Sequence, residues 1–206
     1  MIMSDTFLDK AYALDTPEET RALYDRWADS YDDEIAANGY ATPGRVARAL
    51  AAQVGDSAAP VLDYGCGTGL SGEALRACGF TVIDGMDPSG AMLDGARDKG
   101  VYRALTLLDL EDRAPVPQGA YGAIVAAGVI GVGAAPAETL DMLLTALPPG
   151  GLLAFSFNDH ALADPQYEGR LAPWIERGDA RILSQEHGPH LSGAGIGAMV
   201  YVVART

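Results

Sequence analysis

The spacing of apolar and polar residues along the chain changes near residue 56. Before that point, apolar side chains recur at helical intervals in two segments, which begin at Thr16-Pro17 and at Thr42-Pro43. Threonine can cap a helix and proline suits its first position. We therefore predict one helix to about residue 38 and a second to about residue 54.

After residue 60, short runs that are apolar on both faces alternate with segments of helical periodicity. Five of these runs are predicted strands, at 61–64, 80–86, 103–108, 121–127 and 151–157. Helices are predicted between them, at 70–77, 90–99 and 137–147. Strands buried on both faces and separated by helices are typical of a parallel sheet with helices on either side.

The last part of the chain has a different pattern. Asp164-Pro165 begins a predicted helix that reaches about residue 177. Two predicted strands follow, at 180–186 and 199–204, and a glycine-rich loop separates them. Strands without an intervening helix pair antiparallel. We therefore predict an α/β fold, a Rossmann-like doubly wound sheet of five parallel strands plus a C-terminal antiparallel hairpin.

The length of the chain, 206 residues, is sufficient for one domain with a substantial core. We expect a single domain, in which residues 1–55 form an N-terminal helical lid and residues 56–206 form the Rossmann-like core. No linker or internal repeat interrupts the pattern.

The most informative segment is the run VLDYGCGTG at 61–69. A buried strand includes the acidic Asp63 near its end, and Gly65, Gly67 and Gly69 follow at alternate positions. Glycines allow a ligand to approach the main chain closely. In open α/β sheets such a turn lies at the carboxyl ends of the strands, where ligands bind. We predict a ligand-binding turn here.

Two ligands compete for this turn. The residues Gly67–Gly72 spell GxGxxG, which also occurs in nicotinamide-dinucleotide enzymes, and Asp87 could hold a ribose in either case. However, Asp63 suits a ligand with a cationic amino acid and would repel a pyrophosphate, and a terminal antiparallel hairpin is unusual for dinucleotide folds. The pattern favours S-adenosylmethionine (SAM), and a nicotinamide-dependent oxidoreductase remains the alternative.

Five segments together resemble the successive motifs of class I SAM-dependent methyltransferases. They are DYGCGTG at 63–69, GMDPS at 85–89, LLDLED at 107–112, YGAIVAAGVI at 121–130 and LPPGGLLAFSF at 147–157. The segment YDRWADSYDDEIAANGYATP at 24–43 resembles the lead-in of the Williams–Beuren-region methyltransferase-like branch. The resemblance implies methyl transfer from SAM, with S-adenosylhomocysteine (SAH) as the product.

The resemblance also implies how the cofactor is held. In that family the glycine turn lies against the methionine part of SAM, an acid after the second strand holds the ribose, and an acid after the third strand accepts from the adenine amino group. The implied cofactor-binding residues are Asp63, Gly65, Gly67, Met86, Asp87, Pro88, Asp109, Leu110, Gly128, Val129, Tyr24 and Tyr31. Tyr24, Trp27 and Tyr31 form one helical stripe, which packs in the core or, alternatively, closes over SAM as a lid. Tyr40 is a further lid candidate.

No general base follows from the resemblance. Relatives often carry a histidine just after the fourth strand, where this chain has Gly131-Val132. The turn Asn158-Asp159-His160 follows the fifth strand, and it either binds or deprotonates an acceptor or simply caps the next turn. The catalytic residues are thus left open, with Asp159 and His160 as candidates. His187 and His190 are interpreted as solvated loop residues without a function.

The charge balance bears on the acceptor. Fourteen Lys and Arg stand against 28 Asp and Glu, a net charge of −14, and no basic cluster occurs. Such a chain would repel DNA, RNA and anionic membranes. We expect a small neutral or cationic acceptor in a pocket closed by the N-terminal helix, the Asn158–His160 turn and the helix that contains Trp174. Arg170 and Arg177 in that last helix indicate an alternative, an acceptor with a carboxylate, because either arginine could bind one.

The remaining composition excludes several classes. Two cysteines, twelve residues apart, and three histidines offer little material for a metal site, so none is expected. No apolar run approaches the roughly 20 residues of a membrane span. The N-terminal residues do not resemble a signal peptide, and a cytoplasmic location is expected. A further alternative is a non-catalytic relative that only binds SAM. The sequence does not specify the acceptor, its reacting atom or the oligomeric state.

Overall fold

A computed structural model describes residues 7, 10 and 16–206 of the chain, so the start of the predicted lid lies outside the described residues. The described part contains one seven-stranded sheet in the order β3-β2-β1-β4-β5-β7-β6. Its strands are β1 (Val61–Tyr64), β2 (Ile83–Asp87), β3 (Ala104–Leu107), β4 (Ala123–Ala126), β5 (Leu152–Asn158), β6 (Ala180–Leu191) and β7 (Ile196–Arg205).

The sheet has the predicted topology. Strands β1 to β5 run parallel. Strands β2 and β3 follow on one side of β1, and β4 and β5 follow on the other. The order of strands therefore changes direction between β1 and β4, where Leu62 pairs with Ile124. Strand β7 lies antiparallel between β5 and β6. The predicted Rossmann-like sheet with a C-terminal antiparallel hairpin is confirmed, and the switch between β1 and β4 is the position at which ligands bind in such sheets.

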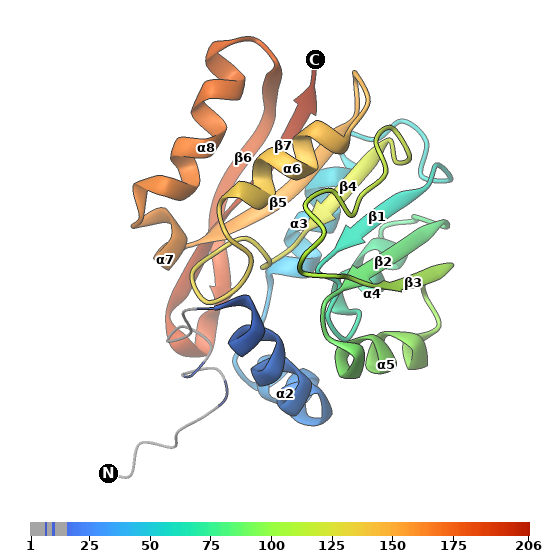
Figure 1. Cartoon of the computed structure of the whole chain (residues 1–206), viewed down its shortest axis with the longest axis vertical. Helices are drawn as coiled ribbons and strands as arrows, with labels where there is room; N and C mark the ends of the chain where they lie inside the picture. The colour runs from blue at the N-terminus through green and yellow to red at the C-terminus, as the bar shows by residue number, and fades with distance from the viewer. Residues whose placement is uncertain (1–6, 8–9, 11–15) are drawn as a thin grey trace.

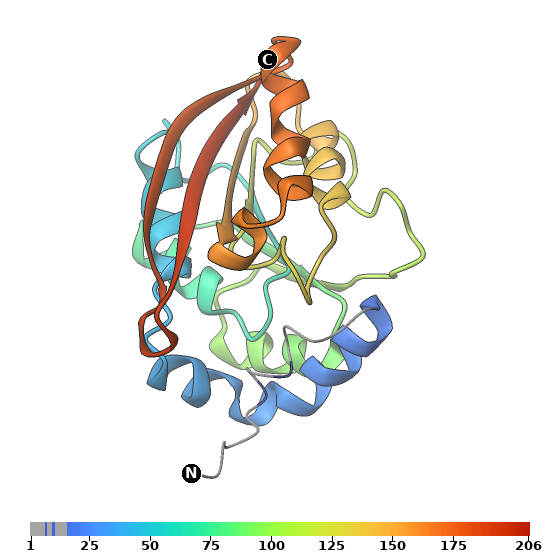
Figure 2. The same cartoon turned by 90° about the vertical axis from the view of Figure 1, so that its left-hand side faces the viewer.

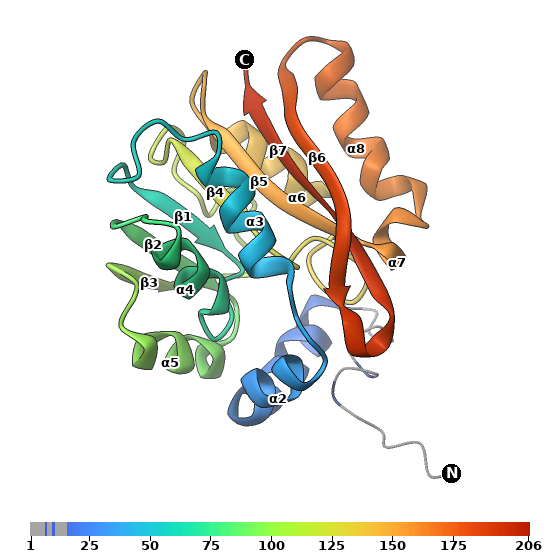
Figure 3. The ribbon, with the colours of Figure 1, turned by 180° about the vertical axis from the view of Figure 1, so that it is seen from behind.

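Helices cover both faces of the sheet. Helices α3 (Thr42–Ala51) and α4 (Leu70–Ala77) lie on the face seen in Figure 3. Helices α6 (Glu138–Ala146) and α8 (Pro165–Glu176) lie on the face seen in Figure 1. Helix α5 (Gly90–Lys99) packs against β2, β3 and the N-terminal helix. The two buried apolar clusters under these layers form the core.

Helix α2 (Pro17–Ala37) belongs to neither layer, because it crosses the carboxyl ends of the strands (Figures 1 and 2). The Thr16 hydroxyl caps it by accepting from the Glu19 amide at 3.2 Å. Its buried side, Leu23, Trp27 and Ile35, packs with Leu191 of β6 in a third apolar cluster. Local capping and a narrow apolar stripe thus place this helix over the edge of the sheet where a ligand binds.

The hairpin differs from the prediction. Residues 187–191 belong to β6, and β7 begins at Ile196, so strand pairing replaces most of the expected loop. The tip also pairs with the segment between α2 and α3, where the Ala41 amide donates to the His190 carbonyl at 2.9 Å. The interpretation of His190 as a solvated loop residue is therefore wrong. Thr42 does not cap α3 either, because its hydroxyl pairs with His190.

None of the described helices combines the length and apolar character that a membrane span needs.

Candidate functional site

The turn after β1 is shaped by glycines. Gly65 has a φ of 69°, and a Cβ there would lie 2.6 Å from Cγ2 of Val129, so the Val129 side chain packs directly against the main chain of Gly65. Gly67 has a φ of 53° and open space in front of it. A side chain at Gly67 would project into this space, which a ligand can use instead.

Asp87, at the end of β2, holds this turn in place. Its carboxylate accepts from the amides of Gly67 and Ser89, both at 2.9 Å. Burial raises the pKa of Asp87 to about 6, against the lowering effect of these two hydrogen bonds. Each carboxylate oxygen can accept a further hydrogen bond, so the carboxylate can still bind the hydroxyls of a ribose.

Asp63 lies beneath the turn rather than at the surface of the pocket. Its side chain is 0% exposed, and Oδ2 accepts from Ser71 at 2.6 Å and from Tyr102 at 2.7 Å. Oδ1 is the one fully enclosed side-chain polar atom without a hydrogen bond among the described residues. Burial, aided by the charge of Asp87, raises the pKa of Asp63 to about 6. The structure thus does not bring Asp63 to the pocket wall with the other predicted residues.

A pocket of about 510 Å³ opens between the turn and α2. Most of the predicted cofactor residues line it: Gly65, Gly67, Asp87, Pro88, Asp109, Leu110, Gly128, Val129, Tyr24 and Tyr31. Met86 is buried in the core below it. The pocket then continues past Pro136 to Thr139 and Met142 of α6. Its size is typical of small-ligand sites.

Helix α2 is fastened over this pocket by polar contacts. Asp32 accepts from the Thr68 hydroxyl and pairs with Lys99 Nζ, each at 2.5 Å, and Asp25 accepts from the Ser89 hydroxyl at 2.5 Å. The aromatic stripe of α2 is expected either to pack in the core or to close over SAM, and its members divide between these two places. Trp27 is buried in the third apolar cluster, whereas Tyr24 and Tyr31 are half-buried and line the pocket.

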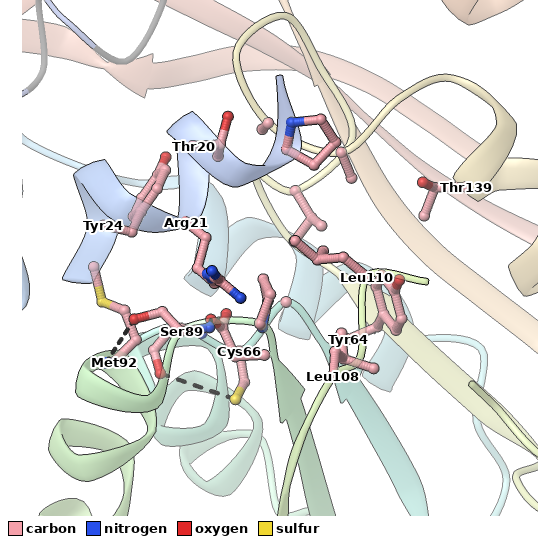
Figure 4. A pocket seen from close by; sticks show the side chains of 18 of the residues that line it. Thr20, Arg21, Tyr24, Tyr64, Cys66, Ser89, Met92, Leu108, Leu110 and Thr139 are labelled. Carbon is pink, nitrogen blue, oxygen red and sulfur yellow. Dashed lines mark hydrogen bonds between the residues drawn. The ribbon is translucent and has the colours of Figure 1, made fainter. Parts of the chain in front are cut away.

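Arg21 is a pocket residue that the sequence reasoning missed. It lies one helical turn before Tyr24, and its side chain points across the pocket towards Cys66 and Ser89 (Figure 4). Its position on the same face of α2 as Tyr24 was the available signal. The two arginines considered instead lie elsewhere: Arg170 pairs with Glu138 and Asp141, and Arg177 pairs with Asp179.

The candidates for catalysis do not line this pocket. Asp159 faces the hairpin, where it accepts from the Gly197 amide at 2.6 Å and pairs with His187 at 2.8 Å, which lowers its pKa. His160 is exposed beside it. Asn158 Oδ1 accepts from the Ala161 amide and so caps the short helix α7 (Asp159–Leu162). Neither the turn nor the Trp174 helix lines this pocket, and of the two only Asn158 of the turn lines a second, smaller cavity.

A second cavity of about 50 Å³, the inner chamber, adjoins the pocket behind α2. It shares Tyr24, Tyr31, Tyr40, Gly128 and Ala134 with the larger pocket. Trp27, Gly131, Ser156, Asn158 and His190 are among its other wall residues. Strand β6 therefore brings His190, which is 5% exposed, to the ends of β4 and β5.

In the described residues, no group of three or more His, Cys, Asp or Glu side chains is arranged to hold a metal ion.

Comparison with known proteins shows the family. The sequence profile described as "Methyltransferase domain" matches residues 36–199. Human methyltransferase-like protein 27 is 32% identical over 158 residues, which are 75% of this chain and 64% of that protein. The bovine 18S rRNA (guanine-N(7))-methyltransferase is 39% identical over 70 residues, which are 34% of this chain and 25% of that protein. The chain thus spans less than two thirds of the length of either relative.

A solved structure agrees in fold. The Burkholderia thailandensis 1,6-didemethyltoxoflavin-N1-methyltransferase, determined with bound 1,6-didemethyltoxoflavin and SAH, has a TM-score of 0.63 at 20% identity, over 94% of this chain and 92% of that chain. The chain belongs to the class I SAM-dependent methyltransferase family, whose cofactor is SAM. The predicted family and cofactor are confirmed, and the comparisons favour SAM over the nicotinamide alternative.

Proposed function

We propose that this chain transfers the methyl group of SAM to a small organic acceptor. The observation that carries the proposal is the pocket of about 510 Å³ beneath α2, which continues from the glycine turn to Thr139 and Met142. A cofactor along the turn leaves the far end of this pocket for an acceptor. The family assignment alone does not specify a small acceptor, because one relative is named as an rRNA methyltransferase.

The residues of the pocket fit the cofactor. Gly67 offers a bare main chain to the methionine part, Asp87 offers carboxylate lone pairs to the ribose, and Asp109 lies between Leu108 and Leu110 where an adenine would lie. When bound, SAM supplies a methyl group that is already activated by a positively charged sulfur. The protein has to orient the acceptor and exclude water, which is worth on the order of 7–11 kcal/mol in well-oriented systems.

The wall of the pocket disfavours a polyanion. Its acidic lining residues are Glu18, Asp87, Asp109, Glu111, Asp112 and Glu138, whereas its basic ones are Arg21 and Arg113. The net charge of −14 also repels the phosphates of nucleic acids at long range. Helix α2, held by Asp32 and Asp25, covers the site that a large acceptor would have to enter.

The test uses SAM with a labelled methyl group. The purified chain is incubated with a cell metabolite extract, with rRNA and with tRNA, and the Asp87→Ala variant is the control for cofactor binding. We expect label in one small product and none in RNA. Label in RNA at a matching rate would contradict the small acceptor. Tight SAH binding without any labelled product would favour the alternative, a non-catalytic relative.

We also infer that residues 1–206 act as one domain, because helix α2 contributes wall residues to the pocket of the core. A cytoplasmic location is supported by Cys66 and Cys78, which are both free. Unpaired thiols are usual in reducing compartments.

A further inference from the structure

The inner chamber has room for a functional group but not for a whole acceptor. A cavity needs about 10–15 Å³ to hold one water, and the chamber has about 50 Å³. It adjoins the pocket at Gly128, two residues after the end of β4, and at the side chains of Tyr24, Tyr31 and Tyr40. An acceptor in the pocket can therefore place its reacting end in the chamber.

His190 is held through one ring nitrogen, and its other ring nitrogen is unpaired within the described part of the chain. Nδ1 pairs with the Thr42 hydroxyl at 2.7 Å, and the ring lies edge-on to Tyr40 with centroids 5.3 Å apart. Cε1 lies 3.9 Å from the position that a Cβ would take at Gly128. Nε2 has no hydrogen-bond partner among the described residues, and it is not among their fully enclosed unpaired atoms. This nitrogen is therefore not fully enclosed, and His190 is a wall residue of the chamber.

The other polar groups of the chamber are poor proton acceptors. Burial and the neighbouring Tyr40, Tyr24, Asp32 and Asp87 raise the pKa of Tyr31, so that it stays a phenol. Of the chamber's described wall residues, none is Asp, Glu, Lys or Arg. A protonated amine would lack a counter-charge there. A neutral hydroxyl is the acceptor that suits such walls.

We propose that His190 is the general base of the reaction, and that the acceptor is a hydroxyl whose proton it removes in the inner chamber. The inference rests on the proposed function. The O–H bond of the acceptor breaks and its proton moves to Nε2. The oxygen lone pair forms the bond to the methyl carbon, while the carbon–sulfur bond breaks and leaves its electron pair on sulfur. One positive charge leaves sulfur and one appears on the imidazole, so the net charge of the site is unchanged.

The surroundings of His190 keep its ring neutral beforehand. Burial lowers its pKa to about 4; Asp159 opposes this shift, and Arg45 and His160 add to it. Tyr40 is the titratable ring in contact. A neutral imidazole at pH 7 accepts a hydrogen bond from a hydroxyl, provided that Nδ1 carries the ring proton and donates it to Thr42.

The first test compares His190→Gln with His187→Gln, an exposed histidine on the same strand. The probe is SAM carrying a ¹³C-methyl group, given with a cell metabolite extract. We expect His190→Gln to lose at least 100-fold in transfer rate, as general-base removal typically does, while His187→Gln stays within threefold. Imidazole should restore part of the rate to His190→Ala. With SAM saturating, the wild-type rate should be flat from pH 7 to 8, above the range in which Asp87 titrates, whereas that of His190→Gln should rise with pH.

The carbon shift of the product should be that of an O-methyl group. An N- or S-methyl product, or a His190→Gln variant that keeps a third of the wild-type rate, would overturn the proposal. SAH calorimetry separates it from the proposed function, because wild type and both glutamine variants should bind within twofold of one another. Failure of the wild type to bind SAH would instead reject the function itself.

The second test does not depend on turnover or on the variants folding. Nitrogen NMR of the histidine rings in the wild-type SAH complex should show His190 neutral from pH 5.5 to 8, with its proton on Nδ1. A proton on Nε2 at pH 7 would leave no lone pair for the acceptor. That result would overturn the proposal whatever the rates are.

Discussion

The contact between Asp32 and the core is predicted to decide how firmly α2 closes the pocket. Asp32 accepts from Thr68, which belongs to the glycine turn, and pairs with Lys99 at the end of α5. Replacing it by alanine removes both contacts without lowering the helix propensity of α2. Any loosening of α2 would therefore report on docking rather than on the helix itself.

The magnitude follows from the surroundings of the two contacts. A hydrogen bond to a charged group contributes about 1.5–3 kcal/mol, but the Asp32 side chain is 41% exposed, so the lower part of that range or less applies. The ion pair with Lys99 adds only a few tenths of a kcal/mol, because surface pairs contribute about 0.2–1 kcal/mol. In the variant Lys99 also retains its second partner, Glu73, at 3.2 Å. A loss of about 1–2 kcal/mol corresponds to roughly 5–30 times more frequent opening of α2.

Hydrogen exchange of the amides in α2 measures this opening directly. Asp29→Ala is the matched control, because Asp29 lies one turn away on the same helix and contacts no partner among the described residues. We expect faster exchange for Asp32→Ala than for Asp29→Ala, and restored protection with excess SAH. The SAH affinity should fall by no more than the same factor, because it depends on the closed fraction. Equal exchange in the two variants would refute the contact as the fastening of α2.

Three further predictions concern single carboxylates and one arginine. Asp87→Ala should weaken SAH at least tenfold by calorimetry, since it removes charge-assisted hydrogen bonds to the ribose; an unchanged affinity would reject that role. Arg21→Gln should weaken SAH about tenfold yet leave 5′-methylthioadenosine unaffected, because only SAH carries a carboxylate; equal losses would place Arg21 elsewhere. In the folded chain the pKa of Asp63 is about 6, against an ordinary value of 3.8. Between these two values the folded state holds a proton that the unfolded state has lost, so the free energy of unfolding should fall as the pH rises through that window. Denaturation of Asp63→Asn should show a smaller fall than that of the wild type.

The cofactor half of the site could be predicted because its residues are local in sequence. Asp87, Asp109 and Gly128 each come at or just after the end of a strand, and parallel strands bring those ends to one edge. The apolar periodicity predicts the strands, so it also predicts which residues lie at the carboxyl edge of the sheet. Asp63 marks the limit of this reasoning, because a position near the end of β1 does not say which way its side chain points. The structure turns it beneath the turn, towards Ser71 and Tyr102.

The acceptor half could not be predicted, because its walls come from segments far apart in the sequence. His190 meets Thr42 across 148 positions and Tyr40 meets the Ala127 carbonyl across 87. Both contacts depend on the hairpin tip pairing with the segment between α2 and α3, where Tyr40 bridges to Leu191. Glycine and proline in the tip predict a loop, and only the partner strand shows that these residues extend β6. The side chains that face the acceptor are thus set by tertiary pairing, so relatives can share the cofactor turn while the residues facing the acceptor differ.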